Sequence, residues 1–153
     1  MIDRQRRLAL RTLTLSLAIA AAALLPSGAR AEEPIPTRVR VAKASRKAPP
    51  LLDPRLADVK KQISALAWQR WELVSDQTLP LTQSGSTFVD LPDGSKAALS
   101  AVEVHGKLVT VEVAIAQKNT QTRVTIEKGQ RIVHQVAKEK DGVALFIVVT
   151  PWP

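Results

Sequence analysis

The stretch DGVALFIVVTPWP (residues 141–153) decides the fold, because it holds the most apolar run of the sequence outside the first thirty residues. Every side chain from 143 to 149 is apolar, so a strand formed here has no polar face. Such a run is typical of a strand that is buried on both faces. We therefore expect residues 143–149 to form an interior strand, covered on both sides by the same domain.

The residues before this run alternate and turn as an antiparallel sheet does. Val109, Val111, Val113 and Ile115 share one face of their strand, and polar residues occupy the other face. Turns are predicted at residues 92–94, 105–106, 117–120, 128–130 and 141–142, and most of these contain a glycine that can take a positive φ. With a shorter strand near residues 71–74, about seven strands are expected.

One helix precedes the strands. Asp53 can cap it, Pro54 suits its first position, and apolar residues then recur at helical spacing as far as Leu66. An amphipathic helix over residues 54–68 would need a sheet to cover its apolar side. The predicted fold class of residues 51–153 is therefore mainly β: an antiparallel β-sandwich or open barrel of about seven strands with one N-terminal amphipathic helix.

The first 31 residues are typical of a cleaved secretory signal peptide. Four arginines precede the apolar segment 13–25, and Ala29-Arg30-Ala31 supplies the small residues of a cleavage site. Arg6-Arg7 also suggests twin-arginine export, but the neighbouring residues match that signal poorly, so the general secretory route is favoured. We expect an exported protein, in the bacterial periplasm or secreted, with no integral membrane span after cleavage.

Residues 32–50 are predicted to be a basic, proline-containing linker without regular structure. The formal net charge of the whole chain is +8, but this linker and the signal together carry most of it, so no folded basic face points to nucleic acid. The linker is interpreted as a solvated spacer, and the alternative is a weak contact with anionic envelope material. The candidate residues for that contact are Arg38, Arg40, Lys43, Arg46 and Lys47.

The sequence contains little that could perform catalysis. It has no cysteine, and neither His105 nor His134 has a second imidazole or a carboxylate at metal-ligand spacing. It also lacks a glycine-rich phosphate loop and a recognisable nucleophile with its base. We therefore expect a protein that is not an enzyme and that uses no metal or cofactor.

The three tryptophans are the candidate residues for contact with a partner or ligand. Aromatic residues are only 3% of the chain, which gives Trp68, Trp71 and Trp152 weight. The alternative is that Trp68 or Trp71 fills the gap between helix and sheet.

The last thirty residues show one local resemblance. A glycine turn at 128–130, a strand at 131–136 and an apolar strand ending in Thr150-Pro151 resemble the end of the channel core of secretins, found in bacterial secretion and pilus systems. The chain departs from that family at Val136-Ala137, where secretins usually have paired glycines, and it is too short for a channel subunit. The resemblance implies envelope assembly machinery.

These observations favour a non-catalytic accessory or structural protein that binds another protein in a cell-envelope assembly or secretion machine, through an exposed strand edge. The alternative is a periplasmic binding module for a lipid, glycan or other small ligand held between helix and sheet. In a third arrangement, residues 141–153 complete a neighbour's sheet and the protein forms oligomers.

Overall fold

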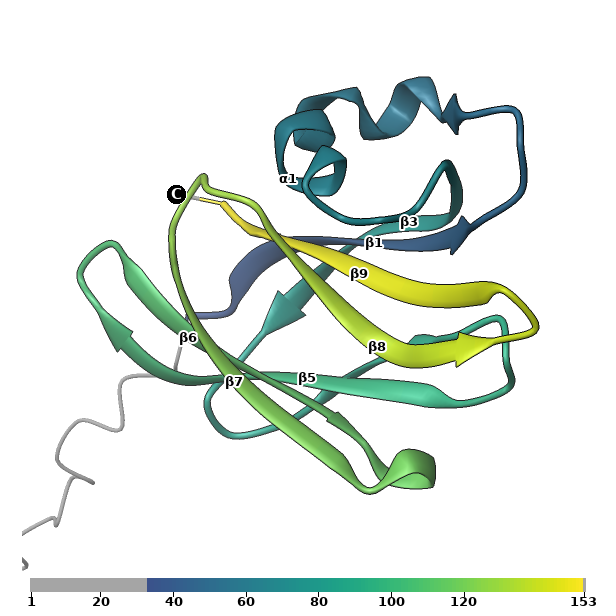
Figure 1. The fold of residues 1–153 in the computed structure, drawn as a ribbon. Coiled ribbons are helices and arrows are strands. Elements are labelled where there is room, and N and C mark those ends of the chain that lie inside the picture. Colours follow the sequence, from purple (N-terminus) through teal and green to yellow (C-terminus); the bar gives the residue numbers. More distant parts are fainter. Residues whose placement is uncertain (1–32, 153) are drawn as a thin grey trace, which may run out of the picture. The chain divides into compact units, whose positions relative to one another are not determined.

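The computed structural model describes residues 33–152, which form a mainly β domain with two sheets (Figure 1). The predicted signal peptide, residues 1–31, lies outside this range. The strands are β1 (Ile35–Ser45), β2 (Leu51–Leu52), β3 (Arg70–Leu81), β4 (Thr87–Asp90), β5 (Lys96–His105), β6 (Leu108–Ile115), β7 (Thr120–Glu127), β8 (Ile132–Lys140) and β9 (Val143–Pro151). The helical turns are η1 (Pro54–Val59), α1 (Lys60–Ser64) and η2 (Ala116–Lys118).

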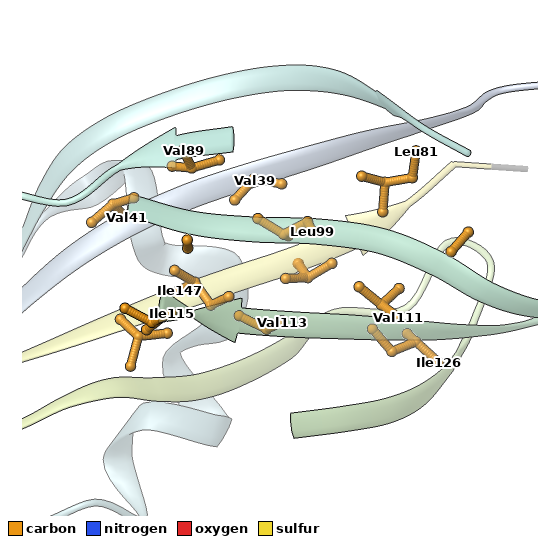
Figure 2. Packing of buried hydrophobic residues seen from close by; sticks show 14 of the residues in the cluster. Val39, Val41, Leu81, Val89, Leu99, Val111, Val113, Ile115, Ile126 and Ile147 are labelled. Carbon is orange, nitrogen blue, oxygen red and sulfur yellow. The ribbon is translucent and has the colours of Figure 1, made fainter. Parts of the chain in front are cut away.

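The two sheets share one hydrophobic core. The first sheet has the strand order β2-β3-β1-β9-β8, and the second has the order β4-β5-β6-β7. All neighbouring strands are antiparallel except the short pair β2 and β3. Side chains from both sheets meet in the core, as Figure 2 shows for Val39, Leu81 and Ile147 of the first sheet with Leu99 and Val111 of the second.

Strand β9 is the interior strand that its sequence predicts. It lies between β1 and β8, and its residues 144–151 are all buried. Leu145 and Ile147 point into the core shared by the sheets, whereas Phe146 and Val148 pack beneath η1 and α1 on the other face. Two covered faces therefore account for the absence of any polar side, and β9 completes its own domain's sheet, not a neighbour's.

Strand β1 corrects the prediction for residues 32–50. A disordered linker was expected, but residues 35–45 form a strand between β3 and β9, with Val39 and Val41 fully buried. The composition was misleading because four of the five basic residues of this segment form ion pairs with carboxylates that lie elsewhere in the sequence. Arg38, for example, binds Asp76 of β3 through two hydrogen bonds of 3.0 and 2.6 Å.

The hairpins follow the predicted turns in most places. Gly94 and Gly106 adopt φ values of +86° and +59°, as expected at the turns before β5 and β6. Strand β3 spans 12 residues, far longer than the short strand expected near residues 71–74. The turn at 128–130 is not a hairpin turn, because the strands that it joins, β7 and β8, do not pair with each other and belong to different sheets.

The helical segment lies on the outer face of the first sheet. Asp53 caps η1 by accepting a hydrogen bond of 3.0 Å from the Arg55 N–H, and it also accepts one of 3.1 Å from the Leu73 N–H of β3. Leu56, Val59 and Ile63 are buried there. In place of one helix over 54–68, the segment forms a 3-10 helix and a five-residue α-helix. Within residues 33–152, no helix has the length and apolar character needed to cross a bilayer.

Candidate functional site

A groove of about 810 Å³ separates the edge strands β7 and β8. Its walls come from both sheets: Val113 and Ile115 of β6, Thr120 and Thr122 of β7, and residues 134–140 of β8. Val113, Ile115 and Val136 also belong to the shared hydrophobic core. The groove is therefore a place where the core is reached from the side of the domain, between two sheet edges.

The groove opens because the two strands diverge. Along the inward face of β7, Ile126 is buried near the turn into β8, Val124 and Thr122 are partly buried, and Thr120 is exposed. Figure 1 shows β7 and β8 separating toward the end of the domain that carries η2. A wedge of this shape leaves room for additional chain at the open end.

The free edges of the two strands differ. Strand β7 pairs with β6 over all eight of its residues with no register shift, and within residues 33–152 it pairs with no second strand. Strand β8 pairs with β9 but carries two register shifts, between Gln135 and Ala137 and between Ala137 and Lys140. Bulges and lysines are features that protect an edge against unwanted pairing. The regular edge of β7 is therefore the better template for an added strand.

His134 lies in the groove wall and is half-buried. It stands opposite Ile147, whose side chain faces the core. Burial lowers the pKa of this imidazole from its ordinary value of 6.5. The side chain is therefore neutral at pH 7, which keeps this part of the wall uncharged.

The lysines at the groove fall into two groups. Lys118 donates a hydrogen bond of 2.5 Å to Asp93. Within residues 33–152, Lys138 and Lys140 form no ion pair, and Glu139 between them is bound to Arg46. The free charge at the rim of the groove is therefore positive.

Asp93 fixes one end of the groove wall. Its carboxylate accepts hydrogen bonds from the Ser95 N–H at 3.0 Å, the Ser95 hydroxyl at 2.5 Å and Lys118. Burial raises the pKa of Asp93, but the hydrogen bonds from Lys118 and Ser95 outweigh it and lower this pKa to about 2. The carboxylate is thus ionised near neutral pH and ties the β4–β5 turn to η2.

Two of the three candidate tryptophans come together, and the third does not. Trp71 is buried with its ring centroid 4.8 Å from that of Phe146, and Trp68 meets the same Phe146 edge-on at 6.3 Å. Trp71 therefore fills the space between the helical segment and the sheet, as one interpretation of the sequence predicted. Trp152 lies after β9 with 42% of its surface exposed.

The five candidate anion-contact residues are mostly engaged inside the domain. Four of them form ion pairs: Arg38 with Asp76, Arg40 with Asp58, Lys43 with Glu72, and Arg46 with Glu139. Arg40 is fully buried, so it cannot reach an external surface, and the prediction is wrong for this residue. Lys47 is exposed and, in the part of the chain that the structure describes, forms no ion pair.

The described residues 33–152 bring together no group of three or more His, Cys, Asp or Glu side chains that could hold a metal ion. His105 contacts Glu103 at an exposed hairpin, far along the chain from His134. The groove itself was missed in the sequence because no residue type marks it. The only feature of the sequence that pointed to such a site was that several strand edges were expected, at which another strand could pair.

No family model, curated protein or solved structure matches this chain. The resemblance of the last thirty residues to secretins therefore stays a prediction that depends on those residues alone.

Proposed function

We propose that this protein is an exported, non-catalytic adaptor that captures an extended segment of a partner protein between β7 and β8. The observation that supports this most directly is the regular, unpaired edge of β7 beside a groove that reaches core side chains. Addition of a strand to an exposed sheet edge is a general mode of peptide recognition, in which backbone hydrogen bonds give affinity and side-chain pockets give specificity.

The incoming strand would extend the second sheet beyond β7. Because side chains alternate along a strand, every second residue of the segment would enter the groove and cover Val113, Ile115 and Val136. The residues between them would face solvent. Apolar residues are therefore expected at alternating positions of the bound segment.

The positive charge at the rim of the groove should favour a partner segment that has carboxylates in the part lying near β8. Lys138 and Lys140 are exposed there and form no ion pair within residues 33–152. A positive rim accelerates encounter with an acidic segment and weakens at high ionic strength. The expected partner is a protein of the cell envelope, since the first 31 residues predict export.

Site-specific crosslinking in cells would test this function. A photo-reactive amino acid is introduced at Thr122 or at Lys138 in the groove, and at Gln77 of β3 as a control, because Gln77 is exposed on the other sheet away from the groove. The expected result is a crosslink from both groove positions to the same stretch of one partner, and none from the control.

Hydrogen exchange would then test strand addition itself. A synthetic peptide of the crosslinked stretch should slow amide exchange within residues 120–126, since an added strand pairs with the free edge of β7. Crosslinks that arise equally from position 77, or peptide protection confined to other strands, would refute the proposal.

A further inference from the structure

A second cavity, of about 310 Å³, lies between α1 and the first sheet. Its walls include Leu51 and Leu52 of β2, Ile63 and Ser64 of α1, and both Trp68 and Trp71. None of these residues lines the β7–β8 groove. The cavity is therefore separate from the site of the proposed function.

The aromatic wall of this cavity is held in place before any ligand arrives. Trp71 is buried against Phe146. Trp68 is held edge-on to Phe146 on one side, and the Arg46 guanidinium lies 4.7 Å from its ring centroid. Arg46 is itself fixed by two hydrogen bonds to Glu139, of 3.0 and 3.1 Å. A preformed apolar wall lowers the cost of ordering side chains on binding.

The mouth of the cavity is cationic. The arginines of this layer are engaged: Arg40 and Arg131 bind Asp58, and Arg55 binds Asp53. Lys60 is exposed, lines the cavity and forms no ion pair within residues 33–152. A ligand with a negative group would therefore find a free charge at the entrance.

One apolar side chain of the cavity wall is exposed to solvent. Leu51, in the cavity wall, exposes 43% of its surface. An exposed apolar side chain next to a cationic rim suits a molecule that has both an apolar chain and a negative head group.

We propose that this cavity binds the hydrocarbon chain of an anionic amphiphile, with its carboxylate or phosphate head group at Lys60. The cavity is open to solvent and has a volume of about 310 Å³, so it takes part of an alkyl chain and leaves the rest along the surface. The apolar walls contact the part of the chain that lies inside the cavity, and Lys60, which lines the cavity, is the cationic residue that meets the head group.

The same geometry disfavours a sugar. Stacking against a sugar needs an open aromatic face, but Trp71 is only 4% exposed and Arg46 covers the ring of Trp68. A hydrocarbon chain needs only contact with apolar surface, which the walls provide.

Calorimetric titration of the purified protein with dodecanoate, below the concentration at which it forms micelles, tests the proposal. Saturable one-to-one binding is expected, with no comparable binding of dodecyltrimethylammonium, which has the same chain and the opposite charge. Inorganic phosphate alone should bind far more weakly, because it lacks the chain.

Matched variants locate the site. Lys60→Glu should weaken dodecanoate binding about tenfold or more, because it reverses the charge beside the head group. Lys61→Glu, one residue away but outside the cavity lining, should change the affinity less than about twofold. Ser64→Trp, which fills the cavity from an exposed position on α1, should abolish binding, with circular dichroism showing that the fold is retained.

Three results would overturn the proposal: no saturable binding of dodecanoate, equal binding of the cationic analogue, or equal effects of the two lysine variants. Each leaves the function proposed for the β7–β8 groove untouched, because that function is measured by crosslinks at residues 122 and 138.

Discussion

Replacing Asp58 with Asn should destabilise the domain far more than replacing its partner Arg40 with Met. Arg40 is fully buried on β1, where its Nη atoms donate hydrogen bonds of 2.7 and 2.8 Å to the Asp58 carboxylate and one of 3.0 Å to the Arg55 carbonyl. Asp58, on η1, is partly exposed and also binds Arg131 at 2.5 Å. Arg40 therefore needs the Asp58 carboxylate to compensate its buried charge, whereas Asp58 has both solvent and Arg131 in addition to Arg40.

This difference between Arg40 and Asp58 determines how much unfolding free energy each variant should lose. In D58N the amide oxygen introduced at position 58 and the Arg55 carbonyl can still accept hydrogen bonds from Arg40, but the buried guanidinium has lost its carboxylate, and breaking a buried ion pair by removing one partner costs about 3–5 kcal/mol. In R40M the buried charge is gone, an unbranched apolar side chain packs beside Ala42, and Asp58 keeps Arg131. Removal of one partner is costly when it leaves the other charge buried and unpaired, and Asp58 is neither fully buried nor unpaired in R40M, so this variant should lose about 1 kcal/mol or less.

Urea unfolding of the two single variants and of R40M/D58N measures this. The double variant should resemble R40M, because D58N is harmful only while the buried guanidinium is present; the coupling energy should then equal the cost of D58N, about 3–5 kcal/mol. A D58N variant that loses less than about 1 kcal/mol, or an R40M variant that loses as much as D58N, would refute the reasoning.

Three further predictions concern the core, a histidine and β1. Ile147→Ala, at a fully buried position of β9, should lower the free energy of unfolding by about 2–5 kcal/mol, whereas Val74→Ala, at a position 46% exposed, should lower it by about 0.5 kcal/mol or less in the same urea experiment. Because burial lowers the pKa of His134, the unfolded chain binds more protons below pH 6.5, so the wild type should lose stability as the pH falls from 6.5 through the lower folded pKa. His134→Gln should remove this part of the pH dependence, and urea midpoints compared between pH 8 and pH 5.5 within each protein would show it; an unchanged slope would contradict the assignment. Deletion of residues 33–45 should abolish cooperative unfolding by circular dichroism, because β1 lies between β3 and β9; a folded deletion variant would show that the first sheet does not need it.

The parts of the fold that depend on local pattern could be predicted from the sequence. The run 143–149 has no polar side and is interior, and glycines at positive φ mark the turns before β5 and β6. Both signals act over a few residues, through side-chain alternation and backbone sterics. They do not depend on knowing which strand lies next to which.

Strand β1 could not be recognised by composition, although its alternation was visible. Val39 and Val41 recur at the spacing of a strand, but the basic residues between and after them suggested solvent. Their neutralising carboxylates stand at positions 58, 72, 76 and 139, so only the folded chain brings the charges together. Charge counted along a sequence was therefore a poor guide to burial here.

The groove depends on strand pairing that no local pattern reveals. The turn at 128–130 contains a glycine as a hairpin turn would, yet its backbone bonds elsewhere: the Lys128 N–H donates to the Lys107 carbonyl at 2.8 Å, and the Gly129 N–H to the Pro151 carbonyl at 2.6 Å. These bonds carry the chain from the second sheet to the first. The sequence predicts two strands joined by a glycine turn, but in the structure these strands, β7 and β8, belong to different sheets.

The burial of β9 explains why β8 lies in the first sheet and not beside β7. A strand that is apolar on both faces needs an interior position, and an interior position needs a hydrogen-bonded neighbour on each side. Strand β1 supplies one neighbour and β8 supplies the other. Because β8 pairs with β9, it belongs to the first sheet; its other edge does not pair with β7, so within residues 33–152 the second sheet ends at β7 with its outer edge unpaired. The run 143–149 therefore decides more than its own position: by drawing β8 into the first sheet, it puts the gap between the two sheets at β7 and β8, where we propose that a partner strand is added.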